Sequence, residues 1–213
     1  MKLSFTGPAF SNLDRNVGYG EAAYNIYEAF KKSDIDVGIN AKEADVEICF
    51  NLPGHYEFHD PKSYKIGYTA WESTDVKPRA RVIMNNLDEI WATSEWVGKV
   101  YKNIFPNKNI FVYKHGINHS WIPEKRKSAH EPFTFLHVGE PYVRKDAQMA
   151  VDSFIELFDD DPNFRLVLKC SGMNTTKVSH PKYGYISSPS AAYDNIVTIE
   201  SFIDDAQFKE LHK

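Results

Sequence analysis

One stretch of the sequence, FTFLHVGEPYVRKD at residues 133–146, constrains the fold more than any other. Its apolar first half predicts a buried strand, which ends at Gly139. Asp146 is a favourable N-cap, and the apolar residues that follow at helical spacing predict a helix over residues 147–158. A buried strand, a short turn and a helix form the repeating unit of an open α/β sheet, in which ligands bind at the carboxyl ends of the strands.

Two cations, Arg144 and Lys145, lie in the turn between this strand and this helix. The N-terminus of a helix offers free N–H groups and the positive end of the helix dipole. Adjacent cations at such a place indicate a site for a phosphate or a diphosphate. The alternative interpretation is that both are solvated loop cations, and their position alone does not decide between the two.

The rest of the chain predicts an alternation of strands and helices on both sides of a polar, proline-containing segment at residues 122–132. Before this segment, strands are expected at 2–6, 36–39, 45–50, 63–69, 89–92 and 109–114, and helices at 21–32, 78–86 and 95–104. After it, strands are expected at 133–138, 164–169 and 196–199, helices at 147–158 and about 204–212, and a long loop at 170–195. The pattern predicts an α/β fold with two Rossmann-like domains, residues 1–121 and 133–213, joined by a linker at 122–132. The second domain, with three strands, is expected to be incomplete.

Three motifs follow one another in a fixed order, and together they resemble a known enzyme family. They are Trp91-Ala92-Thr93-Ser94 between a strand and a helix, His115-Gly116-Ile117-Asn118 at the end of a strand, and Arg144-Lys145. With FRLVLK at 164–169, they resemble the retaining glycosyltransferases of family 4, which have the two-domain GT-B fold. The resemblance covers roughly residues 1–170. It implies an enzyme that transfers a hexosyl or pentosyl group from a UDP- or GDP-sugar to an acceptor hydroxyl.

The resemblance also implies where the two substrates bind. Arg144 and Lys145 are the implied catalytic residues, because charge-assisted hydrogen bonds stabilise a leaving diphosphate. The implied donor-binding residues are Gly18, Gly20, Gly139, Glu140, Arg144 and Lys145, and the implied acceptor-binding residues are His55, Trp71, Glu72 and His115. Glu140 stands where the family commonly has a basic residue, which leaves Arg144 and Lys145 as the main cations. The alternative interpretation of Gly18, Gly20 and Glu72 is ordinary turn and capping chemistry.

Three acidic or histidine groups have the composition of metal ligands but not the required arrangement. His55 and His59, like His115 and His119, lack the H-E-x-x-H order on a helix. The three aspartates at 159–161 precede a proline and are expected to form the turn after a helix. We therefore expect no metal ion and no cofactor besides the nucleotide-sugar co-substrate.

The net charge of −4, from 25 basic and 29 acidic residues, gives the chain no overall basic field that would attract nucleic acid. The sequence does not identify the acceptor, and three candidates remain: a glycan, a lipid-linked sugar, and a hydroxymethylated base in phage DNA. No stretch approaches the ~20 apolar residues of a membrane span, and the N-terminus does not have the pattern of a signal peptide. Cys49 and Cys170 are expected to be buried free thiols, which favours a cytoplasmic location.

The paired-glutamate motif of the family, E-x7-E, does not occur in the sequence. Two interpretations follow. In the first, the chain is a glycosyltransferase that binds its donor weakly on its own, and the open edge of its second sheet is covered by a partner chain, by self-association or by further residues. In the second, it is a non-catalytic remnant that binds a nucleotide or a partner.

Overall fold

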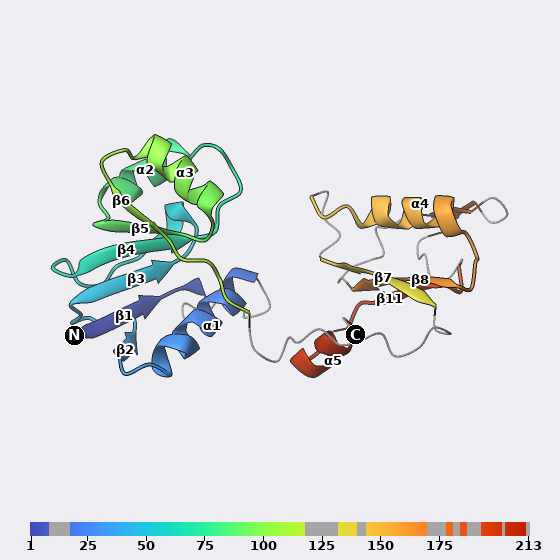
Figure 1. Ribbon diagram of the computed structural model, residues 1–213, viewed down its shortest axis with the longest axis horizontal. Helices are drawn as coiled ribbons and strands as arrows, with labels where there is room; N and C mark the ends of the chain where they lie inside the picture. The colour runs from blue at the N-terminus through green and yellow to red at the C-terminus, as the bar shows by residue number, and fades with distance from the viewer. Residues whose placement is uncertain are drawn as a thin grey trace. The chain divides into compact units, whose positions relative to one another are not determined.

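The computed structural model describes residues 1–8, 18–117, 132–139, 144–169, 178–180, 184–186, 193–201 and 203–211 (Figure 1). The chain divides into two compact units, Met1–Gly116 and Ile117–Lys213, and both contain a parallel sheet with helices. Within the described ranges, no helix is long and apolar enough to cross a membrane.

The first unit is built on a six-stranded parallel sheet. Its strands are β1 Lys2–Thr6, β2 Asp36–Ile39, β3 Val46–Phe50, β4 Tyr64–Thr69, β5 Glu89–Ala92 and β6 Asn109–Val112. Its helices are α1 Gly18–Lys31, α2 Pro78–Asn85 and α3 Glu95–Ile104, with a short 3-10 turn, η2, at Pro53–His55. The strand order is β2-β1-β3-β4-β5-β6 (Figure 1). The direction of strand addition reverses between β1 and β3, and ligands of open α/β sheets bind outside the carboxyl ends of the strands at such a reversal.

Alternate residues along the strands build a separate core on each face of this sheet, as the two-residue period of a strand requires. One core packs against α1, and the other packs against α2 and α3. The alternation is clear in β3, where Ile48 and Phe50 join the α1 core and Cys49 joins the α2–α3 core.

Gly7, directly after β1, lets α1 approach the end of that strand. A Cβ at this position would lie 2.9 Å from the Cβ of Ala23 and 3.2 Å from the carbonyl oxygen of Phe50. Contacts this short are not tolerated in a close-packed interior, so a larger residue would push α1 away from the sheet. The glycine therefore lets α1 pack closely beside the end of β1.

A buried carboxylate secures the loop that leads into β4. Glu47 is 1% exposed. It accepts hydrogen bonds from the N–H groups of His59 at 2.7 Å and Asp60 at 2.8 Å, and from the hydroxyl of Ser63 at 2.6 Å. A buried charge is tolerated when hydrogen bonds satisfy it in this way. Glu47 thus holds the segment before β4 against the sheet.

The second unit has a three-stranded parallel sheet in the order β11-β8-β7. The strands are β7 Phe133–Val138, β8 Phe164–Lys169 and β11 Ile196–Ile199. One face packs against α4 Ala147–Phe158, chiefly through Val151 and Phe154. The unit also contains a two-stranded antiparallel hairpin, β9 Val178–His180 and β10 Gly184–Ile186, and a short helix, α5 Asp205–Glu210.

Most of the predicted elements are confirmed, and β1, β2, β5, α3, β7, α4, β8 and β11 have the predicted bounds. The prediction that β7 is a buried strand is wrong. β7 forms an edge of its sheet among the described residues, and Phe133 and Phe135 are 48% and 37% exposed. β8 holds the centre instead, with Leu166, Val167 and Leu168 buried.

Two further expectations are corrected. α1 begins at Gly18, so Gly18 and Gly20 belong to the first turn of the helix rather than to a loop before it. The segment predicted as one long loop, residues 170–195, contains the hairpin formed by β9 and β10. A run rich in Ser, Thr, Pro and Tyr did not indicate this pairing, because three-residue strands are too short to show a period.

Candidate functional site

The carboxyl ends of the central strands in the first unit are joined to the first turn of α1 by Tyr19. Its phenol donates a hydrogen bond to the carbonyl oxygen of Ala70 and lies 3.4 Å from Oγ1 of Thr69. Burial raises the pKa of Tyr19, and the carboxylate of Glu72 raises it further, while the hydrogen bond with Thr69 opposes both. Tyr19 is therefore a neutral hydrogen-bond donor at physiological pH. It brings Gly18 and Gly20 close to the loop that carries Trp71 and Glu72.

An aromatic row continues from Tyr19 across this end of the sheet. The ring of Phe50 stacks on Tyr19 at 5.2 Å between centroids and meets Tyr68 edge-on at 5.1 Å. Phe50 and Tyr68 are register partners in β3 and β4, and Trp91 in β5 is the next register partner. Such contacts between rings add to the stability that burial gives. These packed rings make the surface at the carboxyl ends of the strands rigid and aromatic.

His115 packs on the same row. The centroid of its imidazole ring lies 5.3 Å from that of the Phe50 ring and 5.5 Å from that of the Tyr68 ring. Removal from water lowers the pKa of His115 below its usual value, so the imidazole is neutral at pH 7 and has one nitrogen that accepts a hydrogen bond. The phenol of Tyr68 donates to the carbonyl oxygen of Tyr113 at 2.7 Å and so fixes the chain two residues before His115.

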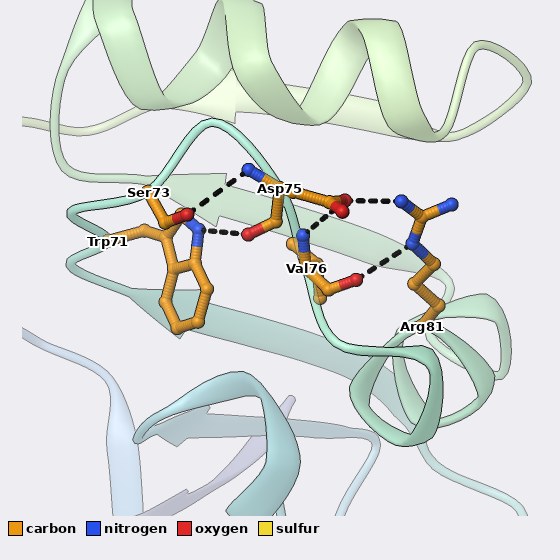
Figure 2. Close-up of polar contacts among 5 residues, drawn as sticks. All are labelled: Trp71, Ser73, Asp75, Val76 and Arg81. Carbon is orange, nitrogen blue, oxygen red and sulfur yellow. Dashed lines mark hydrogen bonds and ion pairs between the residues drawn. The ribbon is translucent and has the colours of Figure 1, made fainter.

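The loop after β4 is held in a defined shape by α2 (Figure 2). Nε1 of Trp71 donates to the carbonyl oxygen of Asp75 at 3.0 Å, and the guanidinium of Arg81 pairs with the carboxylate of Asp75. Nε of Arg81 also donates to the carbonyl oxygen of Val76 at 2.8 Å (Figure 2). The hydrogen bond from Arg81 is the main cause of the lowered pKa of Asp75. The loop thus folds back on itself, with Trp71 and Glu72 at its beginning.

His55 lies at the same edge, at the end of η2, which follows β3. Its N–H donates to the carbonyl oxygen of Leu52 at 2.9 Å, and its carbonyl oxygen accepts from Nδ2 of Asn51 at 3.0 Å. The side chain is exposed. All four predicted acceptor-binding residues therefore follow a strand of the first sheet, and Trp71, Glu72 and His115 are connected through Tyr19, Phe50 and Tyr68.

In the second unit, Lys145, two residues before α4, lies on Gly139, which directly follows β7. The Cγ and Cδ atoms of Lys145 would each lie 3.2 Å from a Cβ at position 139, so the stem of the lysine runs over the glycine backbone. Gly139 has a φ of +155°, which residues with side chains rarely adopt. Its N–H donates to the carbonyl oxygen of Lys169 at 3.0 Å, which continues the pairing of β7 with β8. Arg144 is exposed, and Glu140 lies outside the described residues.

Asp146 caps α4 as predicted. Its carboxylate accepts from the N–H of Met149 at 3.1 Å, and its backbone has a φ of +45°. The cap uses one of the N–H groups that a bound anion would otherwise meet, and it places a negative charge at the positive end of the helix. Attraction for an anion at this turn therefore depends on Arg144 and Lys145 more than on the helix.

The aspartates at 159–161 form a turn at the end of α4. Asp161 accepts from the N–H and the side-chain amide of Asn163 at 2.9 and 2.8 Å, which is the geometry of a turn. Among the residues that the structure describes, no group of three or more His, Cys, Asp or Glu side chains has the arrangement of a metal site. His119 lies outside these residues.

Sequence reasoning missed Tyr19, Phe50 and Tyr68. The available signals were an aromatic residue between two glycines at a helix start, and aromatic residues at the carboxyl ends of two neighbouring strands. The chain matches no protein-family model, and no match among curated proteins reaches significance.

Proposed function

We propose that the chain is a glycosyltransferase of the GT-B fold that moves a sugar from a nucleoside-diphosphate donor to an acceptor hydroxyl, with retention of configuration. The two α/β units would be its two Rossmann-like domains. The observation that carries the proposal is the turn after β7, where the stem of Lys145 lies on Gly139 immediately before α4. This combination of a glycine backbone, two cations and a helix start suits a diphosphate.

The proposed transfer requires groups that stabilise the negative charge of the leaving diphosphate, and Arg144 and Lys145 are placed to do so. When the bond between the sugar and the diphosphate breaks, the bonding electrons stay on the leaving oxygen. Arg144 can offer two parallel N–H donors to it, and Lys145 a compact positive charge. The acceptor hydroxyl passes its proton to an oxygen of the departing diphosphate as its own oxygen bonds to the sugar carbon. Cations that interact more strongly with the transition state than with the bound donor lower the activation barrier.

The carboxyl edge of the first sheet supports an acceptor with hydroxyl groups. Glu72 follows a strand end and is exposed, directly after Trp71 in the sequence, and a carboxylate and an aromatic residue in one loop suit a sugar or another polyhydroxylated ring. The pairing of Arg81 with Asp75 holds the loop in place before any ligand arrives. Neutral His115 adds a hydrogen-bond acceptor.

Calorimetry of UDP and GDP with the whole chain tests the donor site. The Arg144→Glu/Lys145→Glu variant is expected to lose at least about 3 kcal/mol of diphosphate affinity, since hydrogen bonds to charged groups are worth about 1.5–3 kcal/mol each. The Arg79→Glu/Lys99→Glu variant changes the net charge equally, at exposed positions of α2 and α3, and is expected to bind as wild type does. Equal affinity of all three proteins would contradict the proposal.

Release of nucleoside diphosphate from UDP- and GDP-sugars, in the presence of glycan, lipid-linked sugar or hydroxymethylated DNA, tests the transfer itself. Binding without any release, under all acceptors, would favour a non-catalytic nucleotide-binding protein.

A further inference from the structure

One face of the first sheet carries exposed aromatic side chains that no described helix covers. Phe111 in β6 and Tyr113 directly after it are 46% and 47% exposed, and Tyr64 at the start of β4 is 40% exposed. Ile110 and Val112 point to the opposite face and pack against the α2–α3 core, as the alternation along a strand requires. α1 lies on the side away from α2 and α3 (Figure 1), but the buried core beneath it is built from β1, β3 and β4. A contiguous exposed patch of this kind marks an interaction site.

Four side chains make up this surface, which we call the aromatic face: Tyr64, Trp91, Phe111 and Tyr113. The ring centroids of Trp91 and Tyr113 are 4.5 Å apart, and those of Phe111 and Tyr113 are 6.4 Å apart. Trp91 also meets Tyr68 edge-on at 5.7 Å, so the aromatic face continues the aromatic row of the candidate site. Along β6 it spans about 13 Å from Asn109 to Tyr113, at about 3.3 Å per residue.

A carboxylate lies within the aromatic face. Glu89 accepts hydrogen bonds from the phenol of Tyr64 at 3.1 Å and from the indole nitrogen of Trp91. Glu89 and Trp91 are two residues apart in β5, so their side chains point to the same face. A carboxylate has about four acceptor positions, and these bonds occupy two of them. Glu89 is half-buried, so it can accept further hydrogen bonds from a ligand that brings hydroxyl groups.

The residues of this face favour one class of partner over the others. An apolar helix would take Glu89 out of water without offering hydrogen-bond donors, and burial of a carboxylate in this way costs free energy. A nucleic acid requires cations, but the strand residues that share the face, at 64, 66, 68, 89, 91, 109, 111 and 113, include no Lys or Arg. A sugar suits both features, since its C–H surface packs on aromatic rings and its hydroxyl groups donate to a carboxylate.

We propose that the aromatic face binds an uncharged oligosaccharide, which is the acceptor of the proposed transferase. The end that receives the new sugar lies at the carboxyl ends of the strands, beside His115, and the other sugars lie along Tyr113, Trp91 and Phe111. The inference rests on the proposed function and selects a glycan from the three candidate acceptors. The face is longer than one sugar ring, so affinity should rise with the number of sugars until the face is filled.

Calorimetry without any donor tests the proposal, with disaccharides to hexasaccharides of glucose, galactose, mannose or N-acetylglucosamine as ligands. The whole chain is expected to bind at least one of these series, more tightly as the oligosaccharide lengthens. Phe111→Ala/Tyr113→Ala is expected to weaken binding of the hexasaccharide about tenfold or more, because two ring contacts are lost. Phe111→Tyr/Tyr113→Phe keeps both rings and is expected to bind as wild type does. Val82→Ala, at an exposed apolar position of α2, is the control.

Glu89→Gln gives a second test that does not remove a ring, and it is expected to weaken oligosaccharide binding because a neutral acceptor bonds less strongly than a carboxylate. Failure of wild type to bind any of these oligosaccharides, or equal binding by the alanine variant, would overturn the proposal. Light scattering that shows a wild-type dimer and a monomeric alanine variant would also overturn it, because the face would then join two copies. Binding of UDP or GDP without oligosaccharide binding would refute this inference alone, and the reverse result would refute the transferase but leave a glycan-binding face.

Discussion

Tyr19 and Ala70 are 51 positions apart in the sequence, and the phenol of the first donates a hydrogen bond to the carbonyl oxygen of the second. This bond joins the first turn of α1 to the strand end from which Trp71 and Glu72 follow. Tyr19→Phe is expected to lower the free energy of unfolding by about 1 kcal/mol, the usual net value of one hydrogen bond. Urea denaturation measures the change, with Tyr113→Phe as the control, and an unchanged midpoint in Tyr19→Phe would contradict it.

Arg81 holds the conformation of the loop from Trp71 to Val76. We expect it to stabilise this loop and to contribute little to the stability of the whole unit. Arg81→Met should leave the free energy of unfolding within about 1 kcal/mol of wild type, because exposed ion pairs contribute little. Hydrogen exchange of the amides at 71–76 should become faster. Arg79→Met, an exposed change on the same helix, should not affect these amides. Protected amides in Arg81→Met would show that the loop keeps its shape without the arginine.

The pairing of Asp75 with Arg81 should also make the local stability of the loop depend on pH in the acidic range. The pKa of Asp75 is lowered in the folded chain, so the aspartate stabilises the loop above the ordinary carboxyl pKa of about 3.9 and loses this contribution as the pH falls through its lower folded pKa. Amide exchange at 71–76, corrected for its intrinsic pH dependence, should rise in this range in wild type. In Asp75→Asn the corrected rates should be flat.

His115 should make the first unit less stable in weak acid. Its pKa is lowered by loss of water contact, so the folded chain binds fewer protons here than the unfolded chain. Stability should therefore be complete above the ordinary histidine pKa of about 6.5 and decline as the pH falls through the folded pKa. NMR titration of the imidazole measures this pKa, and a value at or above 6.5 would contradict the prediction. His115→Gln should show a smaller loss of stability between pH 7 and pH 5.

Cys49 should react with thiol reagents only when the first unit opens. The side chain is 0% exposed, and burial raises the pKa of its thiol to about 12. The thiolate is the reactive form, so both access and ionisation oppose the reaction. In a Cys170→Ser background, labelling at pH 8 should be slow in buffer and fast in denaturant. Rapid labelling in buffer would show that the α2–α3 core is open to solvent.

Gly139→Ala should disturb the turn in the second unit. The new methyl group would meet the stem of Lys145 at 3.2 Å, in a backbone conformation that alanine rarely adopts. A loss of more than about 1 kcal/mol in the stability of this unit is expected. If the proposed function holds, the affinity for UDP or GDP should fall as well. Gly116→Ala, where a Cβ would have nothing within 4 Å, is the control for glycine replacement.

Helices and strands with a clear hydrophobic period or a capping residue were predicted well from the local sequence. The alternation in β1 and the capping residue Ser94 before α3 are examples, since Oγ of Ser94 accepts from the N–H of Val97 as a cap does. Burial of β7 could not be read in this way, because an apolar run looks the same at the centre and at the edge of a sheet. The outcome depends on which strand pairs with β8, a relation between distant segments.

The candidate site shows the same limit. Strand ends could be located from the sequence, and they lead to Trp71, Glu72, His55 and His115. The contacts that connect these residues run through Tyr19, Phe50 and Tyr68, whose side chains come from three different elements. A single sequence carries no record of such contacts, because it gives residue types and spacing but not which side chains meet.

The order of strands in the first sheet has a consequence for synthesis on the ribosome. Once β1, β2 and β3 have emerged, β4, β5 and β6 each add beside the strand made just before, always at the same growing edge (Figure 1). None of the six strands that the structure describes in this unit has to wait for a distant later segment before it can pair. The sheet can therefore assemble in step with translation, and each newly made strand covers the edge that would otherwise be open to association with other nascent chains.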